Sequence, residues 1–167
     1  MKEYVWLFPV IFMFHEMEEI CGFGIWLDRN MSMLEKRFPF IAKEYSNYSN
    51  EGIAAAVFEE FILLIIICII SRCTDFYCLW LGGLIAFTFH LVVHIIQSIV
   101  IRKYIPALAT SIFALPLSLL LIINSIKIIG LSTNFIIVFS IVGIVIVLIN
   151  LKVAHMLMNK VSRFLRK

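Results

Sequence analysis

The chain has 167 residues, of which 62% are hydrophobic and 15% are charged, and its mean hydropathy is +1.02. A soluble domain of this size is about half apolar and about a quarter charged, so a soluble core could not bury this excess. The composition argues against a disordered chain, a collagen, a disulfide scaffold and a nucleic-acid-binding protein. It predicts one all-α domain, residues 1–167, that forms a polytopic helical bundle in the cell membrane.

Five segments are predicted to cross the bilayer, since a helical crossing takes about 20 mostly apolar residues. Three of them contain no Asp, Glu, Lys or Arg: residues 76–101, 105–126 and 128–151. The other two, residues 4–27 and 53–71, are apolar but contain acidic residues. Because polar backbone groups cannot face lipid unpaired, all five segments should be helices.

Basic residues predict the orientation, because cytoplasmic loops are enriched in Lys and Arg. If the five helices alternate in direction, eleven basic residues fall on one side and three on the other. The eleven lie in residues 28–52, in the turn at 102–103 and in the C-terminal tail, and the three are Lys2, Arg72 and Lys127. We therefore expect the N-terminus outside and the C-terminus in the cytoplasm. A four-span alternative, with the first segment lying on the surface, leaves the other loops on the same sides.

The only long connection, residues 28–52, is expected to be a cytoplasmic loop at the membrane interface. Ser32 and Glu35 have the spacing of a capping box, which predicts that a short interfacial helix begins at Ser32. The sequence Phe-Pro-Phe at residues 38–40 is expected to end this helix. The basic tail from Lys160 to Lys167 is expected to contact anionic headgroups of membrane lipids.

Eight acidic or imidazole side chains lie inside the apolar segments, and seven of them are candidate ligands: His15, Glu18, Glu19, Glu59, Glu60, His90 and His94. An ionised group at the bilayer centre costs on the order of 3 kcal/mol, so protons, a cation or the histidines must neutralise the carboxylates. Helical spacing puts the first three on one face of their helix and the last two on one face of theirs. At about 1.5 Å per residue, the carboxylates and the last two histidines lie in one layer, roughly 10–18 Å below the cytoplasmic boundary.

Carboxylates combined with imidazoles form an oxygen and nitrogen ligand set that suits Zn, Fe or Mn. The seven residues could hold one or two such divalent ions, as inward-facing carboxylates and histidines do in helical bundles. The sequence does not choose between Glu59 and Glu60 as a ligand. Glu16, about 100° from His15 around the helix, is expected to pair with a neighbour or to reach the interface. The competing interpretation is a polar network that only fixes helix packing.

Three functions fit this polar layer. The first is a metal-dependent enzyme, a hydrolase or an oxidoreductase, acting on a lipid or another membrane-embedded substrate, with Glu19 as general base in the hydrolytic form. The metal would then be held by Glu18, Glu59, His90 and His94. The second is a proton- or cation-coupled carrier, although no inverted repeat is visible. The third is a structural or regulatory membrane subunit without catalysis.

Two stretches resemble a known family. The run His15-Glu16-Met17-Glu18-Glu19 resembles the H-x-x-E-E signature that names a family of small prokaryotic membrane proteins. His90 and His94, followed by Arg102-Lys103-Tyr104-Ile105-Pro106, resemble the downstream part of its pattern, in which Gly often stands where this chain has Ala107. The resemblance covers roughly residues 10–115. It implies that the family's defining positions are His15, Glu18, Glu19, His90 and His94, and it implies no function, because the family is uncharacterised.

Overall fold

The computed structural model describes residues 1–46 and 48–165, and this part of the chain contains helices and no strands. A turn of 3-10 helix, η1 (Tyr4–Trp6), is followed by five long helices: α1 (Leu7–Arg37), α3 (Asn50–Thr74), α4 (Cys78–Ile101), α5 (Leu108–Ile129) and α6 (Thr133–Leu165). The short helix α2 (Pro39–Glu44) joins α1 to α3. The all-α prediction is confirmed, because 88% of the residues are helical.

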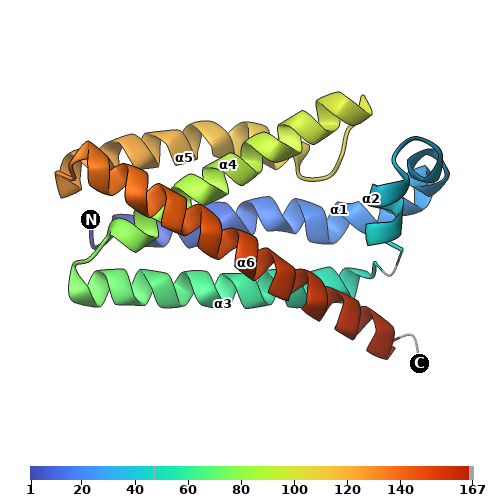
Figure 1. Cartoon of the computed structure of the whole chain (residues 1–167), viewed down its shortest axis with the longest axis horizontal. Coiled ribbons are helices and arrows are strands. Elements are labelled where there is room, and N and C mark those ends of the chain that lie inside the picture. Colours follow the sequence, from blue (N-terminus) through green and yellow to red (C-terminus); the bar gives the residue numbers. More distant parts are fainter. Residues whose placement is uncertain (47, 166–167) are drawn as a thin grey trace.

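Successive long helices run in opposite directions, so that α1, α4 and α6 point one way and α3 and α5 point the other (Figure 1). The α1–α3 connection, the α4–α5 turn and the C-terminal end of α6 therefore lie at one end of the bundle. This is the grouping of loops on which the predicted charge asymmetry depends. Arg166 and Lys167, which contribute to that asymmetry, lie outside the described residues.

Four helices, α3, α4, α5 and α6, are long and apolar enough to cross a membrane. α1 is also long enough, since its 31 residues extend about 46 Å at about 1.5 Å per residue. Its five carboxylates, among them Glu16, Glu18 and Glu19 within the apolar segment, make it less apolar than the others. The predicted bundle of membrane-type helices is thus confirmed by length and composition, while a crossing by α1 stays a prediction.

α4 carries the centre of the apolar core. Trp80, Leu81, Leu84 and Leu91 on this helix are almost completely buried, and α4 packs against both α5 and α6. The indole Nε1 of Trp80 donates a 3.1 Å hydrogen bond to the carbonyl oxygen of Val5. This bond ties the start of the chain to α4 and so fixes the first turns of α1 beside it.

α4 and α6 approach each other closely at two glycines. A Cβ atom added at Gly82 would lie 2.1 Å from the backbone oxygen of Phe139, and one added at Gly143 would lie 2.3 Å from the backbone of Gly82. Small residues at helix contacts allow such backbone approach in membrane bundles. The contact lets α6 pass across α4 and α3 (Figure 1) and enclose the space between them and α1.

The connection after the first predicted span is more helical than expected. α1 continues to Arg37 without a break, so Ser32 lies inside it and the predicted helix start at this residue is wrong. The end of the helix lies where it was expected. Phe38 leaves the helical conformation, as the residue before a proline tends to do, and Pro39 begins α2.

Tertiary contacts explain the longer α1. Leu27, at the predicted end of the span, and Asn30 and Leu34, beyond it, are buried at helical spacing. Asn30 also accepts a 2.7 Å hydrogen bond from Nζ of Lys103, which lies in the α4–α5 turn. Because this buried face continues unbroken, packing favours helix through Ser32, whose side chain is exposed.

Candidate metal centre

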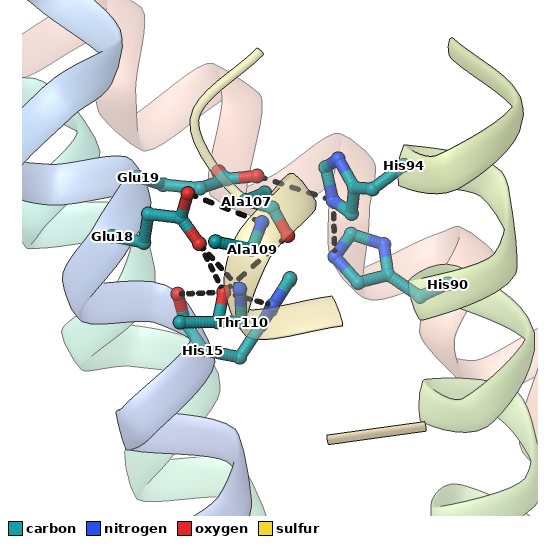
Figure 2. Close-up of polar contacts among 8 residues, drawn as sticks. All are labelled: His15, Glu18, Glu19, His90, His94, Ala107, Ala109 and Thr110. Carbon is teal, nitrogen blue, oxygen red and sulfur yellow. Dashed lines mark hydrogen bonds and ion pairs between the residues drawn. The ribbon is translucent and has the colours of Figure 1, made fainter. Parts of the chain in front are cut away.

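Two helices bring four donor side chains together. His15 and Glu19 are one helical turn apart on α1, and His90 and His94 are one turn apart on α4, so each pair lies on one face of its helix. Figure 2 shows Glu19, from α1, and His94, from α4, pointing toward each other. One donor atom from each of the four residues lies within 4.8 Å of the others. This four-residue group could therefore hold a metal ion.

The contacts inside the group are short. Nε2 of His94 lies 2.8 Å from Nε2 of His90 and 3.1 Å from Oε1 of Glu19. The side chain of His15 is fully buried, and those of Glu19 and His94 retain only 15% and 12% of their exposure. Ligand atoms around a tetrahedral zinc ion, with bonds of about 2.0–2.1 Å, are about 3.3–3.4 Å apart. A small expansion of the two contacts would admit such an ion.

His15 is oriented by Thr110, in the first turn of α5. Nδ1 of His15 lies 3.1 Å from Oγ1 of Thr110, and this hydroxyl donates a 2.5 Å hydrogen bond to Oε2 of Glu18. Since the single O–H of Thr110 is donated to Glu18, the hydroxyl oxygen can only accept a hydrogen bond from Nδ1–H of His15. The lone pair then resides on Nε2, which is buried and has no hydrogen-bond partner within residues 1–46 and 48–165.

Glu18 lies outside the four-residue group and binds the start of α5. Its carboxylate accepts hydrogen bonds from the backbone N–H of Thr110 at 2.7 Å, from that of Ala109 at 3.4 Å, and from the hydroxyl of Tyr104. Free N–H groups and the helix dipole favour an anion at this position. Desolvation and the hydrogen bond to Glu18 raise the pKa of Tyr104 to about 12, which keeps its phenol protonated as a donor.

The two adjacent carboxylates of α3 also lie outside the group. Oε2 of Glu59 accepts a 3.2 Å hydrogen bond from Nδ2 of Asn150 on α6. Glu60, about 100° further round the helix, instead lines a cavity that reaches Glu19 and His94. Of the two, it is Glu60 that shares a cavity with the candidate metal centre.

The sequence predicted no role for Thr110, and it did not predict that Glu16 lines a cavity. Glu16 is 4% exposed and lines the same cavity as Glu60, although it was expected to pair or to reach the interface. Nothing in the sequence indicates this burial. For Thr110 a weak signal exists, because a helix that begins soon after Pro106 offers free N–H groups to a carboxylate from elsewhere.

The fold and the site together define a class: a helical bundle with helices long enough to cross a membrane and a His/Glu cluster between α1 and α4. Residues 6–121 match the family described as "Protein of unknown function with HXXEE motif", and the chain belongs to this family. The matched region contains the whole four-residue group and Thr110. No curated protein and no solved structure matches the chain.

Proposed function

We propose that this protein is a membrane-embedded, metal-dependent enzyme whose ion is held within the four-residue group of α1 and α4, by its three histidines and, in an oxidative form, by Glu19 as well. The observation that carries the proposal is the convergence of three imidazoles and one carboxylate within 4.8 Å. A network that served packing alone would satisfy its buried polar atoms with hydrogen bonds. Nε2 of His15 has no such bond among the described residues, and a metal ion would engage it.

The cavity beside the four-residue group supports the part of the proposal that concerns the substrate, a molecule that enters from the membrane. Its volume is about 330 Å³, and most of its lining side chains are apolar. Ligand pockets in proteins begin at about 300 Å³. Because the same cavity reaches Glu19, His90 and His94, a lipid or another membrane-embedded molecule held there would meet the metal.

Hydrolysis and oxidation both suit this ligand set. His15, His90 and His94 could hold zinc, which when bound would lower the pKa of a water. Glu19, whose Oε1 lies 3.1 Å from Nε2 of His94, would then be placed to act as a general base toward that water. Iron or manganese bound by histidines and a carboxylate would instead support oxidation. The identity of the ion therefore separates the two reaction classes.

Metal content tests the proposal. We expect protein purified in mild detergent to contain about one Zn, Fe or Mn per chain by elemental analysis, and His90→Ala and His94→Ala to lose it. Glu59→Gln is the matched control and should keep the metal, because Glu59 is hydrogen-bonded to Asn150 and lies outside the four-residue group. Folded wild-type protein that contains no metal, and that takes up none of the three ions when they are added, would contradict the proposal.

A second variant separates the two roles open to Glu19. If Glu19 is the general base, Glu19→Gln should retain the metal on the three histidines, with one coordination position left for water. If Glu19 is the fourth ligand of a closed site, the variant should lose its metal as His94→Ala does. The hydrolytic form of the proposal expects retention, whereas the oxidative form, in which Glu19 is a ligand, expects loss.

A further inference from the structure

The cavity beside the candidate metal centre extends far along the bundle. Phe8, near the start of α1, and Phe23, on the same helix, both line it, and these positions are about 22 Å apart at about 1.5 Å per residue. Apolar side chains of the other three helices, among them Leu64, Phe87 and Val147, form much of the remaining wall. The cavity has the length and the apolar lining that suit an extended alkyl chain.

Two carboxylates besides Glu19 line this apolar cavity, Glu16 and Glu60. Glu16 is 4% exposed, and its carboxylate forms no hydrogen bond or ion pair with any described group. The lining residues, all of them in the described part of the chain, include no Lys or Arg. A buried ionised carboxylate is unfavourable without a positive partner, and among the lining residues only the imidazoles of His90, His94 and His155 could become positive. A bound cation would provide such a partner for Glu16.

An organic cation fits these carboxylates better than a second metal ion. The donor atoms that converge within 4.8 Å belong to His15, Glu19, His90 and His94, and the group includes neither Glu16 nor Glu60. An ammonium group is larger than a metal ion and can donate hydrogen bonds to more than one carboxylate. Its alkyl chain would also occupy the apolar part of the cavity, which a metal ion would leave empty.

We propose that the cavity binds an amphiphile whose ammonium headgroup contacts Glu16 and Glu60 and whose alkyl chain lies along the apolar wall. In assigning this amphiphile as the substrate, the inference rests on the proposed function. The two carboxylates that would contact the headgroup lie outside the candidate metal centre, although the same cavity reaches Glu19, His90 and His94.

A comparison of two probes on the wild-type protein tests the site. Dodecylamine and dodecanol have the same alkyl chain and differ in the charge of the headgroup. We expect native mass spectrometry to show one dodecylamine bound per chain, at least about tenfold more tightly than dodecanol, because a charged hydrogen bond is stronger than a neutral one. Equal binding of the two probes would overturn the inference, and this comparison needs no variant.

Substitutions of the two carboxylates then test where the ammonium headgroup binds. Glu16→Gln and Glu60→Gln should each weaken dodecylamine binding about tenfold and leave dodecanol binding unchanged. The matched controls are Glu35→Gln on α1 and Glu51→Gln on α3, whose side chains are exposed; both should bind dodecylamine as the wild type does. Unchanged affinity in both cavity variants would overturn the inference.

The two proposals fail separately. If the wild type contains no metal but prefers dodecylamine to dodecanol, the proposed function is refuted and the amphiphile site stands. If the wild type contains one metal per chain but shows no preference for the amine, the amphiphile site is refuted and the proposed function stands. Preferential binding of dodecylamine by His90→Ala, measured after loss of its metal, would support a site that does not need the ion.

Discussion

A series of hydrogen bonds from Glu18 through Thr110 to His15 shows how single residues orient a side chain of the candidate metal centre. The carboxylate of Glu18 accepts a hydrogen bond from the Thr110 hydroxyl, and that hydroxyl in turn accepts a hydrogen bond from Nδ1–H of His15. Carboxylates and hydroxyls beside ligating histidines commonly fix the ring and its tautomer in this way. Glu18, although it is not in the four-residue group, is therefore connected to the group through Thr110.

Replacing Thr110 should weaken metal binding without removing a ligand. Thr110→Val keeps the shape of the side chain but removes the hydroxyl, so His15 would lose its orientation; we expect the metal affinity to fall about 10–100-fold. Competition with a metal-binding dye would measure this loss. Thr110→Ser retains the hydroxyl and should bind metal nearly as the wild type does. Equal affinity in the valine and serine variants would show that the hydroxyl does not orient His15.

At the scale of elements, the start of α5 decides where Glu18 and Thr110 meet. Ala107, which precedes the helix, has a φ of 98°, in a region that favours glycine because a Cβ atom is crowded there. Its carbonyl oxygen accepts a 2.9 Å hydrogen bond from the backbone N–H of Ser111. The resemblance described in the sequence analysis implies Gly at this position, and the positive φ of Ala107 offers a physical reason for it.

Ala107→Gly should stabilise the protein. Relief of backbone strain of about 1–3 kcal/mol exceeds the entropic cost of a glycine, about 0.5–1 kcal/mol. We expect a net gain of about 1 kcal/mol, which corresponds to a rise in Tm of about 2–4 °C for a chain of this size. Thermal unfolding in detergent would measure it. Ala109→Gly, inside α5, is the control and should lower the Tm; a fall of the same size in both variants would contradict the role given to strain.

At the scale of the whole molecule, the alternating helices gather the basic connections at one end of the bundle (Figure 1). Lys36, Arg37 and Lys43 lie in or near the α1–α3 connection, and Arg102 and Lys103 lie in the α4–α5 turn. The positive-inside rule assigns such an end to the cytoplasm. This orientation is the one we propose for the protein in a cell membrane.

Reporter fusions in a bacterial host test the orientation. Green fluorescent protein fused to the C-terminus should fluoresce, because the rule places that end in the cytoplasm. Fused after Ser132, between α5 and α6, it should stay dark, while alkaline phosphatase at the same point should be active. The reverse pattern would show that the bundle is inserted in the opposite sense.

Local patterns predicted the helices and the pairing of donors within each helix. Long apolar runs are helical because the bilayer core offers no hydrogen-bond partners to the backbone, so its N–H and C=O groups must bond to each other. His15 with Glu19, and His90 with His94, share a face because residues four apart are neighbours on any α-helix. The unbroken α1 was not predicted, since the burial of Asn30 and Leu34 depends on segments distant in the sequence.

Packing between the helices determines which of these side chains come into contact. Glu18 and Glu19 are adjacent, and both were candidate ligands, yet a rotation of about 100° sends one to the start of α5 and the other to His94. The same rotation separates Glu59 from Glu60. A helical pattern specifies the angle between two side chains but not the neighbour that each one faces, because that neighbour belongs to another helix whose position follows from the packed bundle.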